Sequence, residues 1–399
     1  MKHILFFTHG LELGGAERAL IGLLHSLDYA QVQVDLFLMH HGGELMGHIP
    51  EQVNLLPEMP QYASLAVPMG TVLRKGQLGV GLGRFLGKRA ARHAEQRLGI
   101  THDSAVGLEY SHKYTRFFMP PVGSREYDLA VSFLTPHYFV AEKVRAKKKI
   151  AWIHTDYTKI WVDRESELRM WSRYDHIASI SDTVTKTFLE VFPSLKDRIV
   201  LIENILPAGL IRRSAQADCP ADFPDDGSIR LLSIGRYCEA KNFDNVPAIC
   251  RLLREMGLDV KWYLIGFGGD EALIRRRIDE AGMEAYVRML GKREDPYPYI
   301  AHCELYVQPS RYEGNSVTVH EAQVLAKPVI ITRYPTSASQ LRDGFDGIVV
   351  PMDNEGCAQG IADLLRDPEK MKLLSENCLL GDYANTCQAE KLMDLLENA

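Results

Sequence analysis

The sequence predicts an α/β protein of two doubly wound domains, each built on a parallel sheet, that face a central cleft. The chain has 399 residues, which is too long for one ordinary hydrophobic core and fits two. Short apolar runs typical of buried strands alternate with segments of helical periodicity, as in parallel α/β sheets. This alternation stops in a segment rich in proline and aspartate and then restarts. We therefore predict a first domain at 1–205, a linker at 206–228, a second domain at 229–375, and helices at 376–399, which in one alternative pack back on the first domain.

The composition is that of a globular protein in water and argues against several other classes. Apolar residues make up 46% of the chain and charged residues 25%, and the formal net charge is −6. The seven cysteines contain no Cys-x-x-Cys pair, which argues against a zinc site, and their odd number argues against a disulfide framework. No apolar run approaches the roughly 20 residues that span a bilayer, and the run at 4–7 is too short for a secretion signal. We expect a cytoplasmic protein, with a peripheral position on the inner face of the plasma membrane left open.

The first domain begins with a predicted strand at 2–8, a glycine turn at Gly14-Gly15, a helix from Ala16 and a strand at 32–39. Because glycine has no side chain, Gly14 and Gly15 let the backbone approach a ligand and offer N–H groups to an anion. The alternative is an ordinary glycine turn. Further strands of this domain are expected at 127–133, 149–153, 176–180 and 199–202.

His154 directly follows the predicted strand 149–153. Ligands of open α/β sheets bind at the carboxyl ends of the strands, so this side chain is expected to look into the cleft. An imidazole there is able to hydrogen-bond a substrate hydroxyl near neutral pH. The alternative is a histidine whose nitrogen atoms are satisfied by backbone groups.

Residues 71–98 interleave basic and apolar side chains, and Glu95 is the only acid among them. Such a segment predicts a basic amphipathic helix that lies on an anionic membrane surface. The alternative is the solvated face of an ordinary helix. A nucleic-acid partner is disfavoured because the overall charge is negative and no recognition module is evident.

The second domain offers two cations after its first predicted strand, Arg236 and Lys241. Its strands are expected at 229–234, 260–265, 287–290, 305–307, 329–331 and 348–350. A guanidinium and an ammonium near a helix N-terminus suit a diphosphate, although two surface cations are the alternative. Gly266 opens a second glycine turn, which lacks the last glycine of a dinucleotide fingerprint and so disfavours an NAD-dependent dehydrogenase. We interpret it as a turn that lets the backbone approach a ligand.

Glu313 and Glu321 bracket the turn that leads from the predicted strand 305–307 into a helix. Two carboxylates in these positions suit hydroxyl groups on two parts of one polyol ligand. The alternative is a pair of solvated surface acids.

These segments together resemble the retaining nucleotide-sugar glycosyltransferases of family 4, which have the GT-B fold. The resemblance rests on Gly14-Gly15-Ala16-Glu17-Arg18, on Gly235-Arg236 with Lys241-Asn242-Phe243, and on Glu313 and Glu321 with seven residues between them. It covers essentially the whole chain, with the motifs in the expected order. Other features are similar to a bacterial branch that builds capsule, lipopolysaccharide or other cell-surface glycans.

The resemblance implies a role for each matching residue. Gly14 and Gly15 would approach the donor through backbone N–H groups, and His154 would lie by the donor sugar. Arg236 and Lys241 would neutralise the diphosphate leaving group. Glu313 would bind hydroxyls of the donor sugar, and Glu321 those of the ribose. The loop that follows Glu313 would place backbone N–H groups near the sugar and phosphate, through Gly314, Asn315, Ser316 and Val317. Many relatives have Gly-Phe-Gly-Leu-Pro-like residues there, so the identity of the sugar is left open.

The expected activity is transfer of a hexose or N-acetylhexosamine from a nucleotide-diphosphate sugar to a membrane-associated glycan or lipid-linked acceptor. A UDP-sugar is expected from the family alone. Front-face substitution with retention, the mechanism commonly proposed for the family, needs no covalent intermediate, and with Arg236 and Lys241 in place we expect neither a metal nor a cofactor. The alternatives are a nucleotide-sugar epimerase of GT-B fold and a binding protein without catalysis.

Overall fold

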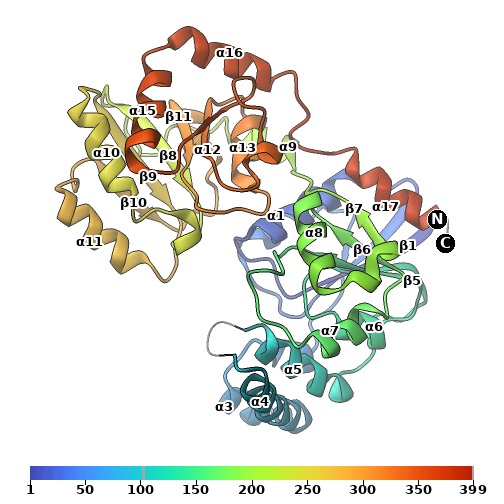
Figure 1. Cartoon of the computed structure of the whole chain (residues 1–399). Helices are drawn as coiled ribbons and strands as arrows, with labels where there is room; N and C mark the ends of the chain where they lie inside the picture. The colour runs from blue at the N-terminus through green and yellow to red at the C-terminus, as the bar shows by residue number, and fades with distance from the viewer. Residues whose placement is uncertain (101–103, 398–399) are drawn as a thin grey trace. The chain divides into compact units, whose positions relative to one another are not determined.

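The structure, a computed structural model, describes residues 1–100 and 104–397. They form two compact units (Figure 1). Unit 1 comprises Met1–Ile205 with the C-terminal stretch that starts at Thr386, and unit 2 comprises Leu206–Asn385. The segment 206–228, predicted as a linker, therefore lies within unit 2, where it contains helix α9 (Ala208–Ser214) and the fully buried Phe223.

Unit 1 is built on a seven-stranded parallel sheet with the order β3-β2-β1-β4-β5-β6-β7. The predicted strands are all present. Their bounds are β1 Lys2–Thr8, β2 Val32–Leu38, β3 Asn54–Leu55, β4 Tyr127–Ser132, β5 Ala146–Ile153, β6 His176–Ser179 and β7 Ile199–Leu201. The helices of unit 1 are α1 Gly15–Ser26, α2 Pro60–Ala63, α3 Met69–Arg74, α4 Leu78–Leu98, α5 Val106–Thr115, α6 Tyr138–Lys143, α7 Arg164–Trp171, α8 Asp182–Val191 and α17 Gln388–Glu397. Short 3-10 turns lie at η1 Glu44–His48, η2 Arg116–Phe118 and η3 Pro193–Arg198.

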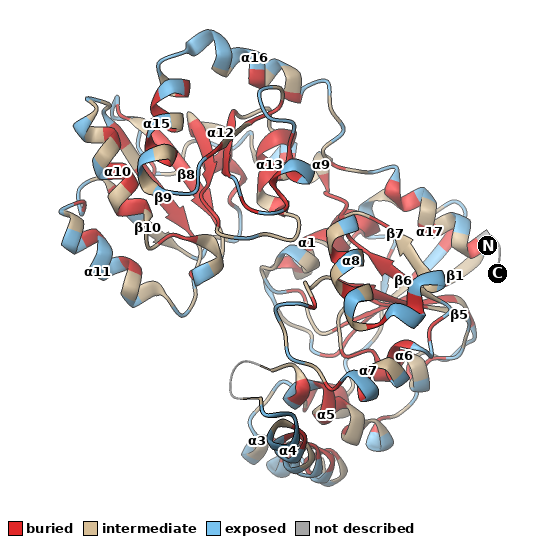
Figure 2. Cartoon of the chain, viewed as in Figure 1, coloured by how far each residue is buried: buried red, intermediate tan, exposed pale blue. Residues whose placement is uncertain are grey.

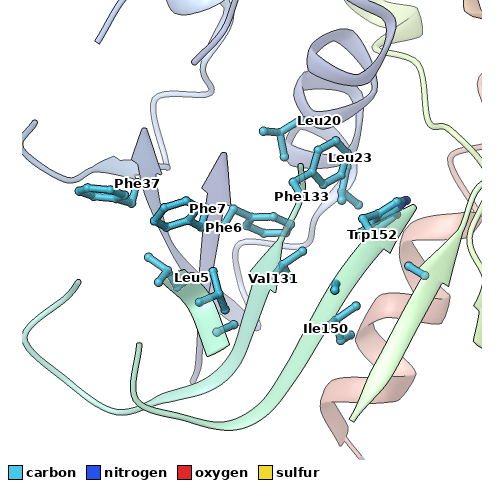
Figure 3. Packing of buried hydrophobic residues seen from close by; sticks show 14 of the residues in the cluster. Leu5, Phe6, Phe7, Leu20, Leu23, Phe37, Val131, Phe133, Ile150 and Trp152 are labelled. Atoms are coloured by element: carbon cyan, nitrogen blue, oxygen red, sulfur yellow. The ribbon is translucent and has the colours of Figure 1, made fainter. Parts of the chain in front are cut away.

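The core of unit 1 follows from apolar strands that are buried on both faces. Phe7 of β1 contacts Phe37 of β2, with ring centroids 5.2 Å apart. Figure 3 shows these rings side by side, with Leu20 and Leu23 pointing from α1 toward the strands. The side chains Leu392 and Leu396 of α17 belong to the same core, which ties the end of the described chain to unit 1.

Unit 2 is built on a six-stranded parallel sheet with the order β10-β9-β8-β11-β12-β13. Its strands are β8 Ile229–Ile234, β9 Val260–Ile265, β10 Val287–Gly291, β11 Leu305–Gln308, β12 Val329–Thr332 and β13 Ile348–Val350. Besides α9, its helical elements are η4 Glu239–Lys241, α10 Val246–Glu255, α11 Glu271–Ala281, α12 Tyr297–His302, α13 Val317–Val324, α14 Ser337–Gln340, α15 Asn354–Leu365 and α16 Pro368–Cys378.

The period-2 alternation of its strands divides the core of unit 2 into two clusters. Trp262 and Leu264 of β9 belong to one cluster, and Tyr263 and Ile265 belong to the other. Successive strand residues point to opposite faces, so each cluster lies on one face of the sheet. Figure 2 shows the strands of this unit as a buried layer between more exposed helices. Both units are therefore doubly wound parallel α/β folds, as predicted.

The basic segment 71–98 differs from its prediction as one amphipathic helix. It is divided between α3 and α4, because the chain turns at Gly76, where φ is +70°. Helix α4 packs against α5 through small residues, and Ala91 and Ala94 share a separate small core with Val106 and Tyr110 of α5.

Candidate functional site

The predicted diphosphate cations and the predicted acid pair come together at one edge of the unit 2 sheet. Strands β8 and β11 are hydrogen-bonded neighbours and run parallel, so the loops that follow them leave the sheet at the same edge. Lys241 lies after β8 and Glu313 after β11. This is the carboxyl edge, where open α/β sheets bind ligands.

Lys241 and Glu313 form an ion pair. The Lys241 Nζ donates to Glu313 Oε1 at 2.6 Å and to Oε2 at 2.8 Å. Glu313 Oε1 also accepts from the Ser310 hydroxyl at 2.6 Å and from Gln308 Nε2 at 3.2 Å. Its side chain is only 9% exposed and that of Lys241 19% exposed. Because the carboxylate is hydrogen-bonded from several sides, it fixes the ammonium group in place. The two residues were assigned separate roles by sequence, and the structure joins them.

Two further contacts hold the loops after β8 and β11 against one another. Asn242 adopts a left-handed conformation, with φ of 59°, and its Nδ2 donates to the Pro309 carbonyl at 2.9 Å. Arg311 donates to both carboxylate oxygens of Asp244, at 2.9 and 2.8 Å. A bidentate pair of this kind fixes orientation as well as distance. These contacts join the two loops, and so they hold Lys241 opposite Glu313.

The loop after Glu313 leads into α13 and is fixed by Gln340 of α14. The Ser316 N–H donates to Gln340 Oε1 at 2.6 Å, and Gln340 Nε2 donates back to the Ser316 carbonyl at 3.2 Å. His320 Nε2 lies 3.0 Å from Asn315 Oδ1. Gly314 and Asn315 are half-buried, whereas Ser316 and Val317 are buried.

Helix α13 begins at Val317 without a side-chain cap and without an acid in its first turn. The first N–H groups of an α-helix have no partner within the helix, and the helix dipole adds positive potential there. Beside Lys241 and Glu313, this terminus offers backbone donors to an anionic group.

Glu321 lies inside α13 and is fully buried. Its Oε1 accepts a hydrogen bond from the Tyr297 hydroxyl at 3.1 Å. It is therefore not a solvated surface acid, which was the alternative interpretation. Its role toward a ribose stays a prediction.

Arg236 and Gly266 differ in their placement. The Arg236 side chain is exposed beside the turn that carries Lys241. Gly266 has a φ of +151°, and a Cβ atom there would lie 1.8 Å from the Gly235 carbonyl oxygen. The absence of a side chain at Gly266 thus lets the loop after β9 contact the loop after β8. The backbone that it approaches in this structure is that of Gly235.

Unit 1 carries the remaining predicted residues, at the carboxyl edge of its own sheet. His154 follows β5, and its ring contacts Phe133, with the centroids 4.6 Å apart. Burial lowers the pKa of His154 to about 3, with a smaller opposing effect from the Phe133 backbone. The imidazole is therefore neutral at pH 7 and is suited to a hydroxyl group.

Gly14 precedes α1, and Gly15 is its first residue. The helix has no side-chain cap hydrogen bond at Gly14, so its first N–H groups point toward this turn. A Cβ atom at Gly14 would lie 2.1 Å from Glu17 Oε2. The carboxylate of Glu17 therefore lies against Gly14 at the helix N-terminus, where the dipole favours negative charge.

Several polar residues that contribute to these sites were not identified from the sequence. They are Gln308, Ser310 and Gln340 in unit 2. In unit 1, the buried His137 lies close enough to His154, His9 and His112 for each of them to lower its pKa. Gln308 ends the buried strand β11 and is itself fully buried. The sequence signal for Gln308 was a polar residue at the end of an apolar strand. Such a buried side chain needs a hydrogen-bonding partner, which indicates other polar groups nearby.

Among residues 1–100 and 104–397, no group of three or more His, Cys, Asp or Glu side chains is placed to hold a metal ion. The seven cysteines are free, and four of them are buried. In the same part of the chain, no helix has the length and apolar character needed to cross a bilayer.

Sequence comparison finds a family model and several relatives that match parts of this chain. Residues 220–378 match the family model of glycosyl transferases group 1. The chain is 27% identical over 208 residues to the lipopolysaccharide core biosynthesis glycosyltransferase LpsE of Rhizobium meliloti, covering 50% of this chain and 58% of that protein. It is 30% identical over 144 residues to an N-acetylgalactosaminyltransferase of Campylobacter jejuni whose named acceptor is a diphospho-undecaprenol-linked saccharide, covering 36% and 39%. The chain thus spans less than two thirds of either relative.

Structural comparison extends over the whole chain. Anabaena Alr3699/HepE, solved with UDP and glucose, superposes with a TM-score of 0.69 at 16% identity, covering all of both chains. TarM of S. aureus, solved in a complex that includes UDP, gives a TM-score of 0.67 at 14% identity, covering 99% of this chain and 100% of TarM. The predicted GT-B fold and the predicted resemblance to glycosyltransferases are confirmed. The assignment to family 4 stays a prediction.

Proposed function

We propose that this protein is a retaining glycosyltransferase that transfers a hexose or N-acetylhexosamine from a nucleotide-diphosphate sugar, with UDP as the nucleotide. The observation that carries the proposal is the Lys241–Glu313 pair beside the uncapped N-terminus of α13, within the segment that matches glycosyl transferases group 1. UDP is supported by the ligands named for HepE and TarM.

The chemistry depends on charge that develops on the leaving diphosphate. As the bond between the anomeric carbon and the diphosphate breaks, Lys241 and Arg236 stabilise the new negative charge without the help of a metal ion. Glu313 keeps Lys241 in position and accepts hydrogen bonds from hydroxyls of the donor sugar. The acceptor oxygen forms its bond on the same face of the sugar and passes its proton to the oxygen of the departing diphosphate, so the configuration is retained.

The remaining predicted residues orient the donor. Gly266 shapes the loop beside Arg236, while Gly314, Asn315 and Val317 present backbone N–H groups to the sugar and phosphate. Ser316 does not take this predicted role, because its N–H donates to Gln340. Glu321 accepts from the ribose. In unit 1, the neutral His154 binds a sugar hydroxyl, and Gly14 and Gly15 present the N-terminus of α1.

The proposed acceptor is a glycan or lipid-linked saccharide in the synthesis of a cell-surface polysaccharide. LpsE and the Campylobacter enzyme, both named for related tasks, support this choice. We further propose that the protein lies on the cytoplasmic face of the plasma membrane through the basic segment 71–98. Arg84 is one of the basic residues of this segment, but it does not join that surface, because it donates to the carbonyls of Ser64 at 2.8 Å and Val67 at 2.6 Å.

A panel of nucleotides and nucleotide-sugars, measured by thermal unfolding and then by product formation, tests the proposal. A ligand at 100 times its Kd stabilises the folded state by about 2.7 kcal/mol. We expect UDP and a UDP-sugar to raise Tm, and the UDP-sugar to be consumed in the presence of a glycan acceptor. Conversion of the donor to its epimer without an acceptor would instead identify a nucleotide-sugar epimerase. Absence of stabilisation by every nucleotide-diphosphate sugar would refute the proposal.

A further inference from the structure

His320 of α13 connects the loop after Glu313 to two buried glutamines. Its Nδ1 lies 3.0 Å from Gln323 Oε1, and its Nε2 lies 3.1 Å from Gln340 Nε2. Gln323 is 1% exposed and Gln340 4% exposed. The same Nε2 lies 3.0 Å from the side-chain amide of Asn315, which belongs to the loop. The two ring nitrogens of His320 therefore contact three amide side chains.

Backbone groups fix the orientation of both glutamine amides. Gln323 Nε2 donates to the Asp346 carbonyl at 3.2 Å, so its oxygen is the atom that faces His320. Gln340 Oε1 accepts from the Ser316 N–H at 2.6 Å, so its NH2 group is the one that faces His320. A carbonyl only accepts and a backbone N–H only donates. Neither amide is therefore able to exchange its two ends without losing a hydrogen bond.

These orientations decide which nitrogen of His320 carries the proton. Burial lowers the pKa of His320, against smaller opposing effects of Gln323 and Asp346. The ring is therefore neutral at pH 7 and carries one N–H. Gln323 offers an oxygen to Nδ1, whereas Gln340 offers an N–H to Nε2. The proton consequently lies on Nδ1, and Nε2 presents a lone pair.

The lone pair on His320 Nε2 orients the amide of Asn315. The structure places Asn315 Oδ1 3.0 Å from this nitrogen. Two lone pairs repel each other at that distance, and the two ends of an amide are assigned from the hydrogen-bond network around them. A half-turn of the amide brings its NH2 group to Nε2 and leaves the surrounding atoms in place. The Asn315 oxygen then lies at the end of the amide that points away from His320.

The outer end of the Asn315 amide is available to a ligand. Within the part of the chain that the structure describes, the atom at this end makes no hydrogen bond to the protein. Asn315 is half-buried and lies in the loop between Glu313, which pairs with Lys241, and Ser316, which precedes α13. Polar groups in such surroundings usually have a hydrogen-bonding partner, so a ligand group is expected there.

We infer that His320 is a positioning residue that turns the oxygen of the Asn315 amide toward the donor, where this oxygen accepts a hydrogen bond from a hydroxyl of the donor sugar. The inference rests on the proposed function, which places the sugar beside Glu313. Because the oxygen only accepts, this position selects a sugar that carries a hydroxyl there over the corresponding deoxy sugar.

NMR of the full chain with isotope-labelled histidine tests the protonation of His320. The signals of this ring are identified by their loss in His320→Phe. At neutral pH we expect a hydrogen on Nδ1 and none on Nε2. Asn315→Asp places a carboxylate oxygen against Nε2, so His320 should then also be protonated at Nε2, because an adjacent anion favours the imidazolium. A wild-type ring protonated on Nε2 would overturn the inference.

Calorimetry with UDP, UDP-glucose and UDP-N-acetylglucosamine measures what the sugar adds to binding. For the UDP-sugar that binds more tightly, Asn315→Ala should weaken binding about threefold to tenfold, the range of one neutral hydrogen bond. Its affinity for UDP should stay unchanged. Asn315→Asp keeps an oxygen at the outer end of the side chain. It should therefore retain the ratio of UDP-sugar to UDP affinity, although its charge weakens both.

A double variant tests whether His320 acts through Asn315. His320→Phe should weaken the UDP-sugar as much as Asn315→Ala does, and the combined variant should bind no more weakly than either. Such non-additivity is expected when two changes remove the same interaction. The matched control is Gln359→Ala, which removes an exposed amide of α15 and should leave all three affinities unchanged.

The outcomes separate this inference from the proposed function. A UDP-sugar that binds equally to the wild type and to Asn315→Ala would refute the inference alone, and additive losses in the double variant would refute the positioning role of His320. If UDP and both UDP-sugars fail to bind the wild type, the proposed function fails and the sugar contact fails with it. The Asn315 variants change a half-buried loop residue, so they decide the question even if His320→Phe does not fold.

Discussion

The two units place titratable groups at the carboxyl edges of similar sheets. In unit 1 these groups are held neutral, whereas in unit 2 they are held as a charged pair. In unit 1, burial dominates: it lowers the pKa of His9 to about 4 and that of His154 to about 3. In unit 2, Lys241 and Glu313 form a hydrogen-bonded ion pair. One edge therefore favours neutral imidazoles, whereas the other holds a charged pair of side chains. The same architecture supplies different chemistry depending on whether a charge finds a partner.

Of the changes predicted for the two units, removal of Lys241 in unit 2 should have the largest effect on activity. Lys241→Ala is expected to lower kcat/KM about 100-fold or more, because the developing diphosphate charge loses its fixed cation. Initial rates with the best donor from the nucleotide-sugar panel measure this. The matched control, Lys261→Ala, removes a lysine that pairs with the partly exposed Asp226 on the same sheet and should leave turnover unchanged. Near wild-type activity of Lys241→Ala and Arg236→Ala would show that unit 2 does not use charge in this way.

Glu167, one of the buried acids of unit 1, should contribute to how stability depends on pH. Burial, aided by Glu109, raises the pKa of Glu167 to about 7. Its folded pKa lies above the unfolded value of 4.5, so the stabilisation is complete below pH 4.5 and is lost as pH rises through 7. Glu167→Gln should remove this loss and raise the free energy of unfolding at pH 8 relative to wild type, by an upper bound of about 3 kcal/mol.

Denaturant unfolding of the full chain at pH 5 and pH 8 tests this prediction. The control variant is Glu165→Gln, on the same helix, because the Glu165 side chain is 79% exposed. An unchanged difference between pH 5 and pH 8 in Glu167→Gln would show that this carboxylate is not held protonated by the fold. His9 and His154 have the opposite pH dependence. Their folded pKa values lie below the unfolded value of 6.5, so the stability that they contribute is lost as pH falls.

The smallest expected effect concerns His154. His154→Gln replaces the ring that is held against Phe133 with a flexible amide, so the hydrogen bond to the sugar hydroxyl is misplaced. We expect kcat/KM to fall about tenfold, which is roughly the contribution of one hydrogen bond. Because the pKa of His154 is about 3, the pH profile of kcat/KM should show no limb from this residue between pH 5.5 and 8 in either protein. A limb near pH 6.5 that disappears in the variant would contradict the neutral, buried imidazole. His25→Gln, at an exposed position of α1, is the control.

Much of the fold was predictable because its elements are determined locally. Strands such as β1 and β9 are short apolar runs, and a parallel sheet needs such runs because both of its faces are buried. Lys241 and Glu313 were predicted as site residues from their position in the sequence. Each follows a strand, and parallel strands end at one edge of the sheet. Their roles in catalysis remain predictions.

Other features depend on tertiary packing and left little trace in the sequence. The ion pair between Lys241 and Glu313 requires the adjacency of β8 and β11, which strand patterns do not specify. Gln340 of α14 accepts a hydrogen bond from the Ser316 N–H, and the distance between these two residues in the sequence does not indicate that they are in contact. The segment 71–98 looked like one amphipathic helix, but the glycines of α4 decide which side is buried.

The return of α17 to unit 1 has a consequence for biosynthesis. Leu392 and Leu396 are fully or almost fully buried in a core whose members outside α17 lie before residue 206. A ribosome therefore delivers all of unit 2 before it delivers the helix that completes unit 1. Domains generally fold as units as they emerge, so unit 2, although encoded second, is the first whose residues are all available. Unit 1 meanwhile carries an uncovered apolar patch that chaperones are able to bind until α17 arrives.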